Sequence, residues 1–86
     1  MDDNVDKRRE IIFEIIENQM EGNDPPEVNK TYQRLKNQGY SDFTTKQLIG
    51  QCLVVELYDI MNEKQEFDEE RYIENLKNLP EEPFEE

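Results

Sequence analysis

The segment from residue 43 to residue 62, FTTKQLIGQCLVVELYDIMN, is the longest apolar-rich stretch of the sequence. When it is placed on a helix at about 100° per residue, nearly every side is apolar. The polar edge is thin and consists of Gln47 and Gln51. A helix of this kind is too apolar to lie on a surface, so we expect other helices or a second chain to surround it. The side far from the main apolar face also carries apolar residues: Val54, Tyr58 and Met61.

The rest of the chain is polar, with 37% charged and 34% hydrophobic residues among 86. This length predicts a single domain over residues 1–80, followed by a flexible acidic tail at 81–86. Cys52 is the only cysteine, so an intramolecular disulfide is excluded and a reducing compartment is favoured. No signal peptide or membrane-spanning run is apparent, and we expect a cytoplasmic protein.

The net charge of −12 is unevenly distributed along the chain. Residues 1–24 carry −5 and residues 62–86 carry −7, whereas residues 25–61 are neutral. Such a surface repels nucleic-acid phosphates and anionic lipid headgroups, so we expect no binding to nucleic acid or membrane. If charge guides association, the partner is basic.

Helical periodicity occurs in four segments and strand-like alternation in none. The pattern therefore predicts an all-α fold, a small bundle of four helices with the third at its centre. Gly50 in the third helix costs about 1 kcal/mol relative to alanine, and a neighbouring helix packed closely there would offset that cost. The predicted helices cover residues 4–21, 25–38, 42–63 and 69–79.

The predicted helix starts carry recognisable capping residues. Asp24 precedes two prolines. Ser41 is the expected cap of the central helix, and Thr44 is the alternative. Asp68 is the predicted cap of the last helix, where Phe67 and Tyr72 occupy the two positions of a hydrophobic staple. These signals define the helix boundaries independently of the apolar periodicity.

Glu56 is the first residue to consider for chemistry, because its position on the central helix lies among apolar neighbours. A carboxylate there is either paired, protonated, or extended to the surface. As a general acid or base it would act with Asp59 and Glu63 as companions on the same helix. We favour a structural role, in which Glu56 bonds a tyrosine hydroxyl or an arginine such as Arg34 or Arg71.

Other catalytic and metal-binding patterns are missing from the sequence. There is no histidine to activate Cys52 or to complete a transition-metal site. The three glycines are isolated, so no phosphate-binding loop is present. We therefore predict no catalytic residues, cofactor, metal or small-molecule substrate.

Four glutamates at spacings of three and four residues form one side of the first helix. One interpretation is a docking face for a basic partner or a mimic of a phosphate backbone. The other is a solvated outer face that keeps the protein soluble. The tail around Phe84 also has two interpretations: it is a short binding segment, or it is disordered without a binding role. The glutamates of the candidate face are Glu10, Glu14, Glu17 and Glu21.

The order of these signals over residues 24–80 resembles a bacterial family of small all-helical modules without an assigned biochemical role. This resemblance implies a helical fold and a cytoplasmic bacterial setting, and it implies no catalytic residues. The matching features are Pro25-Pro26-Glu27-Val28, Arg34-Leu35, Gly39-Tyr40-Ser41, Leu48-Ile49, Leu53, Glu56, Phe67-Asp68, Tyr72, Leu76 and Pro80.

The leading functional hypothesis is a non-enzymatic protein–protein interaction module that binds itself or a larger bacterial protein. Three short helices are few to cover an all-round apolar helix, so a homodimer is one predicted arrangement. The alternative is an acidic decoy that inhibits a nucleic-acid-binding protein. A third hypothesis, an enzyme built on Glu56 and Asp59, requires a pocket that opens onto both carboxylates.

Overall fold

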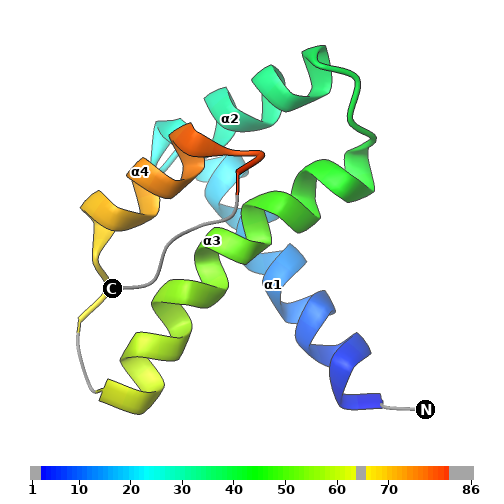
Figure 1. The fold of residues 1–86 in the computed structure, drawn as a ribbon. Helices are drawn as coiled ribbons and strands as arrows, with labels where there is room; N and C mark the ends of the chain where they lie inside the picture. The colour runs from blue at the N-terminus through cyan, green and yellow to red at the C-terminus, as the bar shows by residue number, and fades with distance from the viewer. Residues whose placement is uncertain (1–2, 64–65, 82–86) are drawn as a thin grey trace.

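The computed structural model describes residues 3–63 and 66–81, and within them the chain forms four α-helices (Figure 1). The longest, α3, contacts each of the other three. The predicted all-α fold with a central third helix is therefore confirmed, and each helix boundary agrees to within one residue. Residues 82–86 of the predicted tail lie outside the described residues. The helices are α1 (Asp3–Gly22), α2 (Pro26–Asn37), α3 (Asp42–Glu63) and α4 (Glu69–Asn78).

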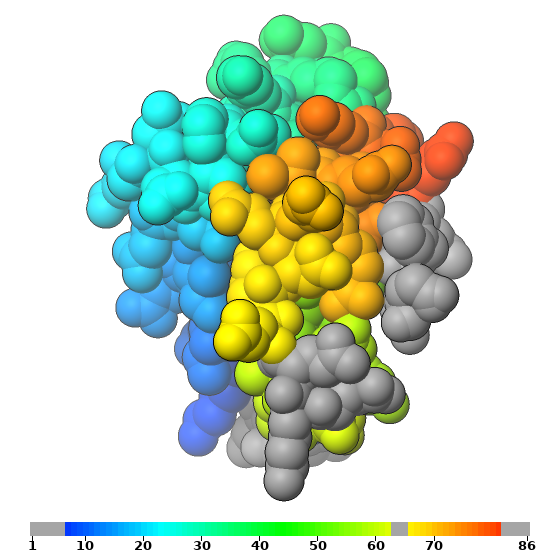
Figure 2. Space-filling view, turned by 90° about the vertical axis from the view of Figure 1, so that its left-hand side faces the viewer, coloured from blue at the N-terminus to red at the C-terminus, as the bar shows by residue number. Residues whose placement is uncertain are grey.

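The helices pack around the first half of α3 and leave its second half less covered (Figure 1). In this view α3 runs diagonally, α2 and α4 lie side by side above it, and α1 crosses behind it. Seen from the side, α4 fills the space between the α1–α2 corner and the end of α3 (Figure 2). Beyond the crossing point, the first half of α1 and the second half of α3 diverge (Figure 1).

The hydrophobic core draws side chains from all four helices. Leu53 and Val55 of α3 are only 2% and 7% exposed, so the expected covering of the central helix is found at both residues. The core cluster consists of Ile16, Val28, Leu35, Ile49, Cys52, Leu53, Tyr72, Leu76 and Leu79.

Gly50 marks the place where α1 crosses α3. A Cβ atom at this glycine would lie 2.9 Å from Cγ2 of Ile12 and 3.7 Å from Cδ1 of Ile16. The two helices thus approach more closely than a side chain at residue 50 allows. The close neighbour that the sequence required to offset the cost of Gly50 is α1.

Two of the three predicted caps are confirmed. The Ser41 hydroxyl accepts from the amide of Thr44 at 3.1 Å, and the Asp68 carboxylate accepts from that of Arg71 at 3.1 Å. The staple is present too, since the rings of Phe67 and Tyr72 lie 5.4 Å apart, edge to face.

The predicted cap at Asp24 is wrong. Pro25 is the residue before α2, and no side chain caps this helix. The backbone N–H of Asp24 donates instead to the carbonyl of Gln19 at 3.0 Å, which satisfies an orphan carbonyl at the end of α1. Asp24 therefore belongs to the end of one helix and not to the start of the next.

The expected covering of α3 is incomplete on one side. Val54, Tyr58 and Met61 are 49%, 57% and 77% exposed. They follow Gly50 along the helix, in the region where α1 has already diverged from α3 (Figure 1). The second half of α3 therefore has one closed side and one open side.

Candidate functional site

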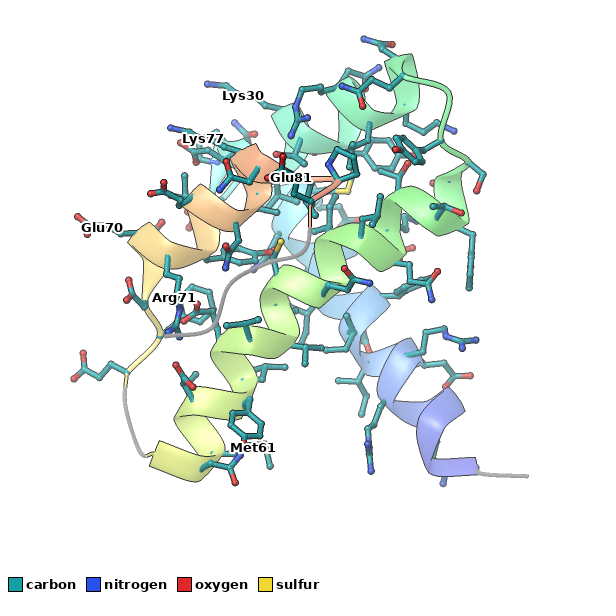
Figure 3. The ribbon with its side chains drawn as sticks, viewed as in Figure 1. Lys30, Met61, Glu70, Arg71, Lys77 and Glu81 are labelled. Carbon is teal, nitrogen blue, oxygen red and sulfur yellow. The ribbon has the colours of Figure 1, made fainter. Side chains whose placement is uncertain are left out.

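Glu56 lies in the interior, with only 1% of its side chain exposed. Its Oε2 accepts from Nε of Arg71 at 2.6 Å, and its Oε1 accepts from Nη2 of Arg71 at 3.1 Å. Oε1 also accepts from the backbone N–H of Asp68 at 3.0 Å. Both oxygens are thus engaged, and the arginine comes from the start of α4 (Figure 3).

Asp59 lies beside Glu56 and also pairs with the Arg71 guanidinium. The bond to Glu56 and the bond to Asp59 raise the pKa of Arg71 further above its ordinary value. One cation therefore neutralises two carboxylates, and the cluster joins the middle of α3 to the start of α4. This geometry matches the structural reading of Glu56, a paired carboxylate.

Arg34, the other arginine considered for Glu56, has a different role. Its guanidinium donates to the carbonyl of Leu79 at 2.8 Å and to that of Leu76 at 2.9 Å. It thereby binds carbonyls at the end of α4, of which that of Leu76 also accepts from the backbone N–H of Leu79. The sequence offers no signal for this contact, because the partners are backbone atoms more than forty residues away.

Cys52 is fully buried as a free thiol. Burial raises its pKa to about 12, so the thiol stays protonated at neutral pH and is a poor nucleophile. Within residues 3–63 and 66–81, no group of three or more histidine, cysteine or acidic side chains is arranged to hold a metal ion.

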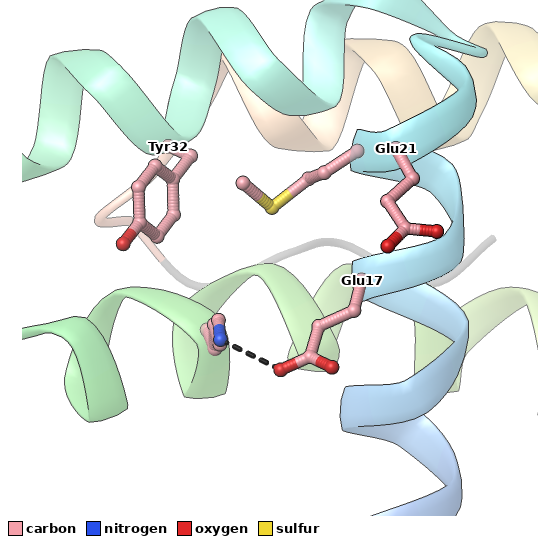
Figure 4. Close-up of a pocket in the computed structure, with 5 residues that line it drawn as sticks. Glu17, Glu21 and Tyr32 are labelled. Atoms are coloured by element: carbon pink, nitrogen blue, oxygen red, sulfur yellow. Dashed lines mark hydrogen bonds and ion pairs between the residues drawn. The ribbon is translucent and has the colours of Figure 1, made fainter.

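A shallow pocket lies where α1, α2 and α3 meet (Figure 4). Glu17 and Glu21 stand on α1, and Tyr32 faces them from α2 (Figure 4). Met20 forms an apolar part of the lining, and Lys46 of α3 completes it. The pocket therefore combines two carboxylates, one ammonium group and an apolar surface.

Lys46 and Glu17 of this pocket form an ion pair that extends to Asp42. Lys46 Nζ lies 2.9 Å from Oε2 of Glu17 and 3.5 Å from Oδ2 of Asp42. The Tyr32 hydroxyl donates to Asp42, which raises the pKa of the tyrosine and lowers that of the carboxyl. The bond to Glu17 raises the pKa of Lys46. The network joins the three helices where they meet.

The predicted acidic face of α1 is split by this network. Glu10, Glu14, Glu17 and Glu21 are all exposed. Glu17 pairs with Lys46, and Glu17 and Glu21 line the pocket, whereas Glu10 and Glu14 do not. The pair was not foreseen, because its members are 29 residues apart in the sequence.

The open side of α3 is a second candidate surface, because exposed apolar side chains lie on it. Val54, Tyr58 and Met61 follow one another at spacings of four and three, so they form one line along the helix. Met61 lies near the C-terminal end of α3 (Figure 3). Ile11 of α1 is also exposed, at 55%. We refer to Val54, Tyr58 and Met61 as the apolar stripe.

Comparisons with known proteins give no family to assign. No protein-family model, curated protein or solved structure matches the chain. None of the helices in the described part of the chain is long and apolar enough to cross a bilayer.

Proposed function

We propose that this protein is a non-enzymatic protein–protein interaction module that binds its partner through the apolar stripe. The observation that carries the proposal is the exposure of Val54, Tyr58 and Met61, from 49% to 77%, on the central helix of the fold. Exposed apolar side chains aligned on one helix are typical of a surface that another protein covers. The cluster around Glu56 supports the non-enzymatic part, since both of its carboxylate oxygens are already bonded.

A cytoplasmic setting fits this proposal. The one cysteine is a buried free thiol, which a reducing compartment preserves. The charge of −12 supports solubility of a module that carries an apolar docking surface.

No observation favours the alternative of an acidic decoy. A decoy requires free carboxylates in phosphate-like spacing along one continuous surface. Exposed acids stand on α1, at the start of α3 and on α4, and Glu17 of the candidate face is ion-paired with Lys46.

A photo-crosslinking amino acid at position 58 tests the proposal in the cell that produces the protein. We expect a specific adduct with another protein from position 58 and none from position 14, an exposed residue of α1. Equal adducts from both positions, or none from either, would contradict docking through the stripe.

A further inference from the structure

Met61 is the most exposed large apolar side chain among the described residues, and it belongs to the apolar stripe. It is 77% exposed, whereas Val54 and Tyr58 are 49% and 57% exposed. Its side chain lies near the C-terminal end of α3, where the other helices leave it uncovered (Figure 3). The thioether sulfur of Met61 is therefore open to molecules dissolved in water.

Met20 provides a comparison, because it is the other methionine that the structure describes. It is partly buried, packs against the hydrophobic core and lines the pocket between α1, α2 and α3. Met61 is not one of the residues that pack against this core. Reaction of a methionine with a dissolved oxidant depends on the access of the oxidant to the sulfur. Met61 should therefore react before Met20.

Oxidation of Met61 changes the property on which the apolar stripe depends. A thioether is apolar and flexible, so it adapts to the surface of another protein. Methionine sulfoxide carries a polar oxygen, and burying that oxygen without a hydrogen-bond donor costs free energy. In the free chain the oxygen stays in water, because Met61 lies outside the core. Oxidation thus opposes docking and leaves the fold unchanged.

We propose that Met61 is a site of reversible oxidation by peroxides, and that its sulfoxide weakens docking through the apolar stripe. This inference rests on the proposed function and adds its regulation. The sulfur lone pair attacks one oxygen of hydrogen peroxide, an S–O bond forms, the O–O bond breaks, and water leaves. Sulfur loses two electrons and the peroxide gains them. Methionine sulfoxide reductases, supplied with electrons by a thiol, reverse the change.

Selective oxidation is tested on the purified chain without any partner. The folded protein is treated with hydrogen peroxide, and mass spectrometry of its peptides follows the oxidation of Met20 and Met61 over time. Met61 should react at least about threefold faster than Met20, and in urea the two rates should become nearly equal. Purified methionine sulfoxide reductases with a thiol should then restore Met61. Equal rates in the folded protein, or a sulfoxide that the reductases leave in place, would overturn the inference.

The stability of the oxidised chain is measured by urea denaturation of a Met20→Leu protein. Its urea midpoint should be the same before and after oxidation of Met61, because this side chain is outside the core. A clear fall in the midpoint would mean that the sulfoxide acts on the fold, and it would overturn an effect confined to docking.

The effect on docking is tested by repeating the crosslinking from position 58 after a pulse of peroxide in the cell. The adduct should fall at least about threefold, both with the original methionines and in Met20→Leu. Met61→Leu is the matched control, because leucine is not oxidised and its adduct should be the same with and without peroxide. An equal fall in Met61→Leu, or no fall in any of the three proteins, would overturn the regulation.

The proposed function and its regulation can fail separately. If peroxide leaves the adduct unchanged, docking through the apolar stripe stands and the regulation falls. If no adduct forms before peroxide is added, docking falls and the regulation falls with it. Faster oxidation of Met61 than of Met20 would still stand in that case, because the mass spectra do not depend on a partner.

Discussion

Val54 and Val55 are the same residue type at neighbouring positions, yet the first is 49% exposed and the second 7%. They lie on the open and the closed side of the second half of α3. On the closed side, Glu56 draws the start of α4 onto α3 through Asp68 and Arg71. On the open side, the tight crossing at Gly50 fixes where α1 touches α3, and α1 then diverges (Figure 1). Hydrophobicity alone does not determine which side is covered, because helix crossing geometry also does.

The largest loss of stability is expected from removing the ion pair between Arg71 and Glu56 on the closed side. Arg71→Met leaves the buried Glu56 without its cation and should lower the free energy of unfolding by about 3–5 kcal/mol. Urea denaturation monitored by circular dichroism measures this change. Arg71→Lys is the control, since it keeps the charge but loses the two-pronged contact and should cost less. A loss below about 1 kcal/mol for Arg71→Met would show that the cluster does not hold α4.

The two valines compare the sides directly. Val55→Ala should lower the free energy of unfolding by about 1.5–3 kcal/mol, because it removes buried methyl groups. Val54→Ala should change it by less than about 0.5 kcal/mol, because half of that side chain is in water. The two variants share the same chemical change and helix, so each is the control for the other. Equal losses would mean that the open side is covered in solution.

Alkaline pH should lower the free energy of unfolding, because the buried thiol of Cys52 ionises more readily in the unfolded chain. In the unfolded chain the thiol loses its proton from about pH 9, whereas burial raises its pKa to about 12 in the folded protein. The unfolded state then binds fewer protons, so stability falls by about 1.4 kcal/mol per pH unit above pH 9. Tyr72, whose pKa burial also raises, adds to the slope above pH 10.

Urea midpoints at pH 8, 9 and 10 measure this slope, with Cys52→Ala as the control. The variant should lose the thiol's share of the fall in stability between pH 9 and 10. Identical slopes in both proteins would show that Cys52 ionises as easily in the folded state as in the unfolded one.

The smallest change in stability is expected at Gly50, where α1 crosses α3. Gly50→Ala gains about 1 kcal/mol of helix propensity, but its methyl group overlaps Ile12, which costs about 1–3 kcal/mol. We expect a net loss of about 1 kcal/mol in the free energy of unfolding. In an Ile12→Ala background the overlap is absent, so the same change should stabilise the protein. Destabilisation in both backgrounds would place the cost elsewhere than at this contact.

The features that the sequence predicts correctly are local or periodic. The caps at Ser41 and Asp68 act within three residues, and the central place of α3 follows from its own apolar pattern. Asp24 shows the limit of local rules, because its backbone is used by the preceding helix. A cap signal between two close helices does not say which helix it serves.

The parts of the candidate surfaces that could not be predicted depend on tertiary geometry. The sequence predicts that another helix or a second chain covers Val54, and its exposure within the chain follows only from the divergence of α1 and α3. Pairing of Glu17 with Lys46 joins two helices whose crossing no periodicity specifies. Glu56 is intermediate, since its burial could be inferred from the helix pattern but its choice of Arg71 over Arg34 could not.

The two arginine contacts of α4 have a consequence for how the fold opens. The helix has ten residues, too few to persist alone in water. The start of α4 is hydrogen-bonded to Glu56 of α3. The carbonyl of Leu76, near its end, accepts from Arg34 of α2. Fraying at either end must therefore break a contact with another helix. Amide hydrogen exchange in α4 is accordingly coupled to the opening of α2 and α3, and the shortest helix shares their cooperative unit.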